Sequence, residues 1–366
     1  MNKSTLVNIS FLLLSVNIAS AEFSIRNIFG GKKTQPEPAA EETGPDLKFR
    51  WEITPGAGMY SGIVKEKVFT EKDELLSRLD WIDYAVPVIG CGFYGSWLNY
   101  FGKADFSLAV PYKWGKMEDR DWLDIMGNYN PLTLDATHFS THDSYLNKNM
   151  NLSAVLGYRM SVKKVDVSPF LGYRMRNVEW TARDGVYQYD TEYYSDYHNA
   201  KEESFSGNII NFEQGYDIVF MGVDVKYNFS DWSAGVDFSF CPYLMESSRD
   251  SHYLPDLVTG LGKTFFDDLD GGFGFDINGY VNWNQWRFRI GYEFLMCNTG
   301  RTIQQSIGRY KPPHPLLGHP GVSSNRFTLS AAYSINNFNK KETASVKKKI
   351  KDALVKKLLI DKIFKK

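Results

Sequence analysis

Two short patterns of ionisable residues, more than a hundred positions apart, could perform acid–base chemistry. Asp119-Arg120-Asp121 and Asp250-Ser251-His252 each follow a run of alternating apolar and polar residues. Residues i and i+2 of an extended strand point to the same face, so each pattern directs two ionisable side chains one way. If the two strand ends meet across a cavity, three carboxylates and one imidazole come together. Such a set can activate a water molecule.

The spacing of Asp250 and His252 indicates how that activation would work. A carboxylate beside a histidine fixes the imidazole tautomer and stabilises the imidazolium that forms when the ring takes a proton. An aspartate across the cleft could share a water with His252 and direct it towards a peptide carbonyl, while its neighbouring aspartate raises its affinity for a proton. Alternation turns Ser251 away from His252, so we expect no serine nucleophile. Both patterns also occur by chance, and a solvated acidic loop is the alternative for residues 118–124.

The elements that must position these residues are alternating runs separated by turns, between residues 47 and 338. We expect ten strands, the first of them broken near Pro55-Gly56. They are Lys48–Phe69, Trp81–Leu98, Asp105–Trp114, Asn151–Met160, Val165–Trp180, Tyr216–Phe229, Ser233–Met245, Gly272–Trp283, Trp286–Met296 and Arg326–Ile335.

The connections between these strands alternate in length. Short links alternate with long polar loops, which we expect at about 70–77, 115–147, 181–212, 246–268 and 297–324. This asymmetry, with aromatic residues near the strand ends, predicts an all-β fold: a ten-stranded antiparallel transmembrane β-barrel with long extracellular loops. A soluble β-sandwich is the alternative. In the barrel, both ionisable patterns lie in outer loops at the same rim.

The two ends of the chain differ from the barrel in composition. We expect a signal peptide at 1–21, a flexible arm at 22–46, the barrel domain at 47–338 and a basic amphipathic tail at 339–366. A solvated basic tail is an equal alternative for the last segment. No apolar stretch after the signal is long enough for a spanning helix, which excludes a helical membrane protein. The three cysteines are expected to be packed side chains, with one disulfide as the alternative.

The chain resembles the omptin family of outer-membrane proteases along almost the whole barrel. The residues responsible for the resemblance are Ser61-Gly62, Lys65-Glu66-Lys67-Val68, Leu79-Asp80-Trp81, Met117 to Asp124, Ser140-Thr141-His142, Gly172-Tyr173, Trp180 to Gly185, Glu246-Ser247-Ser248 and Asp250 to Tyr253.

The resemblance implies an endopeptidase that cleaves polypeptides next to basic residues. Asp250 and His252 would be the dyad that activates water, and Asp119 and Asp121 the opposing pair. Two further acids would bind substrate. Glu66 occupies the position of an acid in the pocket for the first basic side chain, and Asp135 matches the acid of the neighbouring pocket.

The sequence departs from the family at two places. Ser248 stands where a second pocket acid is expected, so we expect a weaker preference for basic residues. The family also has a lipopolysaccharide-phosphate site on the outer barrel face. At the matching stretch, Met175 and Asn177 replace an acid and an arginine, and alternation sends Arg174 and Arg176 to the other face. The resemblance implies that activity requires lipopolysaccharide. Because the matching residues differ, we hypothesise that this requirement is lost or replaced in this chain.

The remaining expectations concern partners and other functions. We expect polypeptide substrates with basic residues, contact with outer-membrane lipid, a monomer, no metal or other cofactor, and no general binding of nucleic acid at a net charge of -1. His138 and His142 are four positions apart, a spacing that could bind a metal ion, but they lie in an expected loop without a convincing further set of ligands. We therefore expect no metal site there. The alternative function is a catalytically silent barrel that acts as an adhesin or a small pore.

Overall fold

A computed structural model of the chain describes residues 49–123, 135–189, 197–253, 262–306, 313–316 and 318–336, without the side chain of His314. The expected signal peptide, the expected arm and the expected basic tail all lie outside these residues. The longer strands are β1 (Arg50–Phe69), β2 (Leu75–Trp97), β3 (Tyr100–Ala109), β4 (Tyr112–Asp121), β5 (His138–Tyr158), β7 (Val165–Tyr189), β8 (Glu202–Asn228), β9 (Trp232–His252), β10 (Lys263–Trp283), β11 (Trp286–Cys297) and β14 (His319–Tyr333). The shorter elements are β6 (Met160–Val162), β12 (Gly300–Ser306), β13 (His314–Pro315), β15 (Ile335–Asn336) and the 3-10 helix η1 (Tyr197–Asn199).

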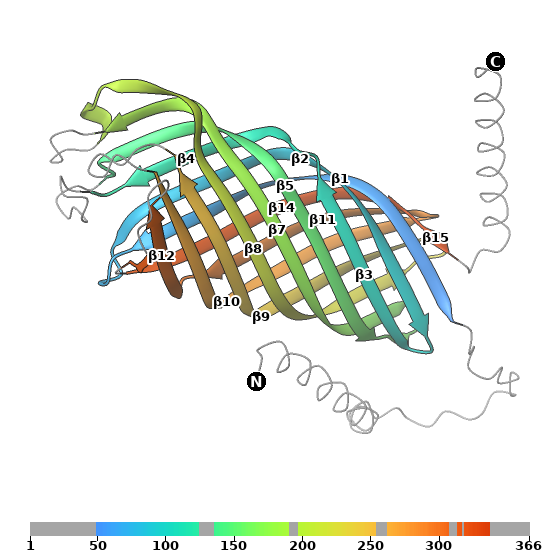
Figure 1. The fold of residues 1–366 in the computed structure, drawn as a ribbon. Coiled ribbons are helices and arrows are strands. Elements are labelled where there is room, and N and C mark those ends of the chain that lie inside the picture. The colour runs from blue at the N-terminus through green and yellow to red at the C-terminus, as the bar shows by residue number, and fades with distance from the viewer. Residues whose placement is uncertain are drawn as a thin grey trace, which may run out of the picture. The chain divides into compact units, whose positions relative to one another are not determined.

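The strands form a closed antiparallel ring, and Figure 1 shows them tilted around a barrel. β3 and β4 both pair with β2, one after the other, so together they act as one interrupted strand of the ring. β11 and β12 likewise both pair with β10 and act as one strand. β1 pairs with both β2 and β14, which closes it. The ten places are therefore β1, β2, β3–β4, β5, β7, β8, β9, β10, β11–β12 and β14, which confirms the predicted ten-stranded all-β fold.

The predicted loop boundaries were wrong at the open rim. Much of the expected loop sequence is strand: β4 continues to Asp121, β5 starts at His138, and β9 continues to His252. β1 also has no break at Pro55-Gly56, where both residues pair with β2. These strand ends stand beyond the apolar outer surface, so their outward side chains are polar and the alternation that identifies a lipid-facing strand is missing.

The outer surface of the barrel has an apolar band near the short turns. It is bordered by exposed aromatic residues, with Trp97, Trp232 and Trp283 at the turns and Tyr84 and Tyr112 on the opposite side. Between them the exposed apolar side chains include Ile89, Phe93, Leu108, Leu156, Val225, Phe238, Ile277, Phe288, Ile290 and Leu329. This is the distribution expected of strands that cross a lipid bilayer. Among the described residues, no helix is long and apolar enough to cross a membrane.

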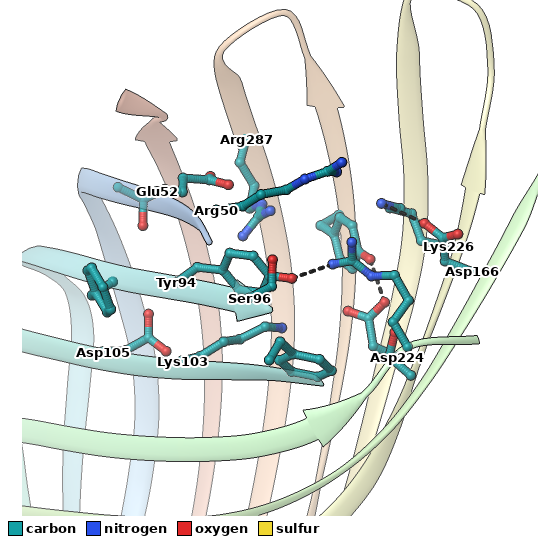
Figure 2. A pocket seen from close by; sticks show the side chains of 16 residues that line it. Arg50, Glu52, Tyr94, Ser96, Lys103, Asp105, Asp166, Asp224, Lys226 and Arg287 are labelled. Atoms are coloured by element: carbon teal, nitrogen blue, oxygen red, sulfur yellow. Dashed lines mark hydrogen bonds and ion pairs between the residues drawn. The ribbon is translucent and has the colours of Figure 1, made fainter. Parts of the chain in front are cut away.

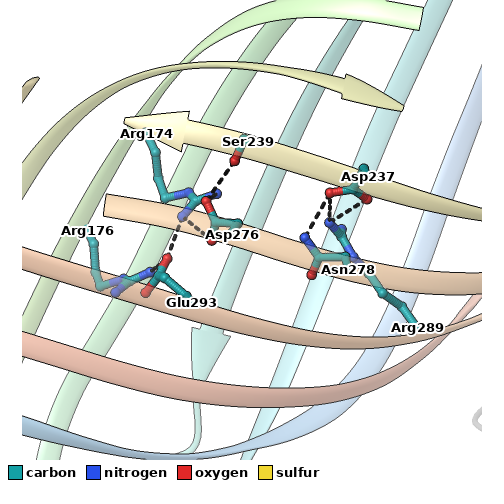
Figure 3. Close-up of polar contacts among 8 residues, drawn as sticks. All are labelled: Arg174, Arg176, Asp237, Ser239, Asp276, Asn278, Arg289 and Glu293. Atoms are coloured by element: carbon teal, nitrogen blue, oxygen red, sulfur yellow. Dashed lines mark hydrogen bonds and ion pairs between the residues drawn. The ribbon is translucent and has the colours of Figure 1, made fainter. Parts of the chain in front are cut away.

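Charged side chains occupy the lumen inside the apolar band. Arg174 bonds to Asp276 at 3.3 Å and to Glu293 at 2.5 Å, and Arg176 bonds to Glu293 at 2.6 Å (Figure 3). The prediction that Arg174 and Arg176 face away from lipid is thus confirmed. Nearer the short turns, a cavity of about 240 Å³ is lined by positively and negatively charged side chains, for example Lys103 and Asp224 (Figure 2).

An aromatic cluster fills the lumen above the band. Trp81 on β2 stacks on Trp180 on β7 at 5.7 Å and on Phe212 on β8 at 5.6 Å between ring centroids. All three rings are fully buried. Phe212 is the register partner of Asp250. The cluster therefore lies beside the ionisable residues at the rim and lowers the dielectric constant around them. The structure describes all three cysteines, and none of them forms a disulfide among the described residues.

Candidate active site

Two strand ends supply the four ionisable residues singled out in the sequence. Asp119 and Asp121 are the third-last and last residues of β4, where they pair with Leu79 and Ser77 of β2. Asp250 and His252 are the corresponding residues of β9, which runs between β8 and β10. Both pairs therefore lie in strands rather than in the predicted loops. This placement gives them a rigid backbone on both sides.

Asp250 and His252 form a hydrogen-bonded pair. His252 Nε2 lies 2.5 Å from Asp250 Oδ2, and the Asp250 side chain is buried while His252 is partly exposed. The edge of the Phe265 ring contacts His252 at 5.4 Å between centroids. The hydrogen bond to Asp250 uses Nε2. The carboxylate and the phenyl ring thus fix the imidazole, and the bond to Asp250 leaves its other ring nitrogen, Nδ1, unused.

Asp119 and Asp121 interact electrostatically with this pair. Burial raises the pKa of Asp119 well above its usual value, and the negative charge of Asp121 raises it further, while His252 opposes the change. Burial also raises the pKa of Asp121, against a hydrogen bond from Ser77 and the charge of His138. Asp119 Oδ1 is buried and has no hydrogen-bond partner within the described ranges. The structure therefore brings the four predicted residues into one electrostatic cluster.

The acids also determine the charge of the imidazole. Burial lowers the pKa of His252, but Asp250 and then Asp119 and Asp121 outweigh it and raise the pKa to about 9. The cluster can therefore hold an imidazolium beside carboxylates. The neutral imidazole can accept a proton from water, and the imidazolium that forms can donate that proton again.

The two predicted substrate-binding acids lie in different surroundings. Glu66 on β1 is only 4% exposed, and its pKa is raised well above its usual value by burial, then by Asp250 and other acids of the cluster. Asp135 is half exposed, and its carboxylate lies 3.6 Å from His198 Nε2 on η1. The structure brings Glu66 to the four-residue cluster and gives Asp135 a different partner.

Three residues of the cleft were missed by reasoning from sequence. Tyr189 on β7 bonds to Ser140, and burial followed by the charges of Asp119 and Asp121 raises its pKa well above the usual value. Glu246 and Asp267 are buried acids near Glu66. Alternation along β9 could have identified Glu246, since it lies four residues before Asp250. No sequence pattern indicates Asp267, which reaches the cleft through strand pairing.

Metal ligation has no geometric support in the described part of the chain. No group of three His, Cys, Asp or Glu side chains there has an arrangement suited to a metal ion. His142 bonds to Ser140 Oγ at 2.8 Å and to the Asp184 carbonyl at 2.7 Å, and the His138 ring packs on Tyr189. Both histidines lie on β5, in contrast to the expected loop.

Comparisons with known proteins identify the family and a matching barrel fold. Residues 50–272 match the sequence model of the Omptin family. Protease 7 from Escherichia coli strain K12 is 24% identical over 217 residues, which cover 54% of this chain and 62% of that protein, and the O157:H7 protein gives the same values. The crystal structure of the outer membrane protease OmpT from Escherichia coli superposes with a TM-score of 0.65 at 19% identity, covering 80% of this chain and 97% of that one.

Proposed function

This chain belongs to the omptin family and is an outer-membrane β-barrel, and from this premise we propose that it is an endopeptidase with its active site at the open, extracellular rim. The observation that supports the proposal best is the His252–Asp250 hydrogen bond beside the Asp119–Asp121 pair. An adhesin or a pore needs no such arrangement. The aligned region spans less than two thirds of the curated relatives, so the activity remains a proposal for this chain.

The proposed reaction is hydrolysis by an activated water molecule. A water held between His252 and Asp119 gives a proton to the imidazole, and its oxygen bonds to the peptide carbonyl carbon. Asp250 stabilises the imidazolium. The C–N bond of the tetrahedral intermediate then breaks as His252 returns the proton to the leaving nitrogen. The products are a carboxylic acid and an amine, and no cofactor is consumed.

Glu66 supports a preference for substrates with basic residues. Its carboxylate is buried close to Asp250, and its Oε2 atom has no hydrogen-bond partner in the part of the chain that the structure describes. A guanidinium or ammonium group on the residue before the cleaved bond would supply that partner. Asp135 remains a weaker candidate for the next subsite, because its side chain is half exposed and close to His198.

The proposal is tested by replacing the dyad. His252→Ala and Asp250→Asn should each reduce kcat/KM for a peptide with paired basic residues by about 10²- to 10⁴-fold, the usual contribution of a general base. Cleavage of the peptide is measured by mass spectrometry, and folding by the heat-dependent gel mobility of the barrel.

A second His–Asp pair at the same rim offers a matched control. His319 Nε2 lies 2.8 Å from Asp73 Oδ1 and has no interaction with the acid cluster among the described contacts. His319→Ala should leave cleavage unchanged. Cleavage that survives His252→Ala would disprove the mechanism. A folded wild-type protein that cuts no peptide would favour the adhesin or pore.

A further inference from the structure

Ser248 faces a buried carboxylate on the neighbouring strand. Asp267 of β10 is its register partner across the β9–β10 ladder, and the Ser248 hydroxyl donates a 3.4 Å hydrogen bond to Asp267 Oδ2. Asp267 is 6% exposed, and its other carboxylate oxygen accepts a 2.6 Å bond from Thr302. An acid is thus present one strand away from the position where the sequence lacks it.

Glu246 supplies another carboxylate to the same place. It precedes Ser248 by two residues on β9, so both side chains point into the barrel. Glu246 is 2% exposed, and its Oε1 accepts a 2.9 Å bond from Gln214. Ser248 also lies close enough to hydrogen-bond to this carboxylate and lower its pKa, while Oε2 is buried with no partner in hydrogen-bonding geometry among the described residues. Such an oxygen lacks the hydrogen bond or cation that buried carboxylates normally have.

The charges around these acids have the same sign. The strongest charges acting on Glu66 are those of Asp250, Asp267 and Glu246, and all of them raise its pKa. The charge of Asp267 also raises the pKa of Glu246, which is about 8 mainly through burial. Lys65 and Lys67 flank Glu66 in the chain, but alternation places them on the outer face. A cation that enters the cluster would therefore stabilise several carboxylates at once.

We propose that Glu246 and Asp267 complete, with Glu66, a subsite for the basic side chain that precedes the cleaved bond, and that Asp267 replaces the acid missing at position 248. The inference rests on the proposed peptidase function and deepens it. The guanidinium of arginine has five N–H donors and can serve several carboxylate oxygens, including the unpartnered Oε2 atoms of Glu66 and Glu246. The selectivity for basic residues is therefore strong despite Ser248.

The kinetic test compares two peptides that differ only in an arginine or its uncharged isostere citrulline before the cut. Asp267→Asn and Glu246→Gln should each lower kcat/KM for the arginine peptide by at least about tenfold, as expected for loss of a charge-assisted contact. Cleavage of the citrulline peptide should be unchanged in both variants. Asp268→Asn is the matched control, since Asp268 is 67% exposed and bonds to Arg301. Its arginine-to-citrulline ratio should equal that of the wild type.

A binding measurement separates this inference from the proposed function. The His252→Ala protein, with and without Asp267→Asn, is titrated with benzamidine in a calorimeter. Weaker binding by the double variant would support the subsite even if the wild type cleaves nothing, in which case only the peptidase proposal fails. If the wild type cleaves peptides and the arginine-to-citrulline ratio is the same in Asp267→Asn and Glu246→Gln, the inference is wrong.

Discussion

The acids of the cleft hold more negative charge than a buried site tolerates in the fully ionised state. Asp119, Glu66 and Glu246 all have raised pKa values, with burial as the largest cause and neighbouring carboxylates as the next for Asp119 and Glu66. His252 can compensate part of this charge: burial lowers its pKa, but Asp250 and then Asp119 and Asp121 raise it to about 9. Proton distribution among these residues therefore controls the proposed chemistry.

The pH dependence of cleavage follows from His252. A general base acts in its neutral form, so kcat/KM for an uncharged citrulline peptide should rise with pH towards the pKa of about 9. Asp119→Asn removes a negative charge that raises this pKa, so the rising limb should move to lower pH, with a lower maximum. Initial rates between pH 5 and 10 test this, and Asp268→Asn is the control. A limb that stays in place would show that Asp119 does not act on the base.

At the scale of elements, a bulge in β7 turns one strand end towards the cleft. Two β7 residues, Asp184 and Gly185, lie opposite the single residue His142 of β5. Before the bulge, the even-numbered residues Trp180 and Ala182 point into the barrel. After the bulge the alternation is shifted by one residue, so the odd-numbered Tyr189 points inward and lies close to Asp119 and Asp121. Bulges of this kind re-aim side chains near active sites.

Gly185 is needed at this bulge for two reasons. Its φ of 125° disfavours other residues, and a Cβ there would lie 2.1 Å from the Thr141 carbonyl oxygen. Gly185→Ala should cost at least about 1–3 kcal/mol of stability, the usual range for such backbone strain, and should lower kcat/KM by displacing Tyr189. Thermal unfolding in detergent and peptide cleavage measure the two effects.

Gly207→Ala is the matched control for the bulge. Gly207 has a φ of 90°, but a Cβ there would meet nothing within 4 Å. This variant should show backbone strain alone and keep its cleavage rate. Equal losses of activity in both variants would contradict the role assigned to the bulge.

At the scale of the whole molecule, the arginines of β7 stabilise the lumen rather than contact lipid. Arg174 and Arg176 meet the acids Asp276 and Glu293 of β10 and β11 from across the barrel (Figure 3). On the outer side of the same stretch, Tyr173 bonds to Asp217. Removing an arginine from the lumen would leave buried carboxylates unpaired, which is strongly destabilising.

This arrangement bears on the expected lipid requirement. Both arginines are paired with acids inside the barrel. They therefore cannot bind a lipid phosphate on the outer face of this stretch. Detergent-refolded protein should therefore cleave peptides at the same rate with and without lipopolysaccharide. Calorimetric titration of the lipid phosphate provides a second measurement. A strong rise in activity on adding lipopolysaccharide would contradict the hypothesis.

The sequence alone determined the ten strands and singled out the four residues proposed for the site. Alternation is a local property that each strand shows by itself wherever one face contacts lipid, so the lower strand segments could be located. The i, i+2 spacing likewise placed Asp119 with Asp121 and Asp250 with His252. Above the apolar band both faces are polar, and for that reason β4, β5 and β9 were predicted to end too early.

Only the tertiary structure decided what surrounds those four residues. Strand register joins residues that are distant in the chain, and it placed Asp267 opposite Ser248. A single extra residue in β7 reversed the direction of Tyr189. Asp135, assigned to a subsite by resemblance alone, lies half exposed beside His198. Pairing and bulges depend on the whole ring closing, and no segment contains that information by itself.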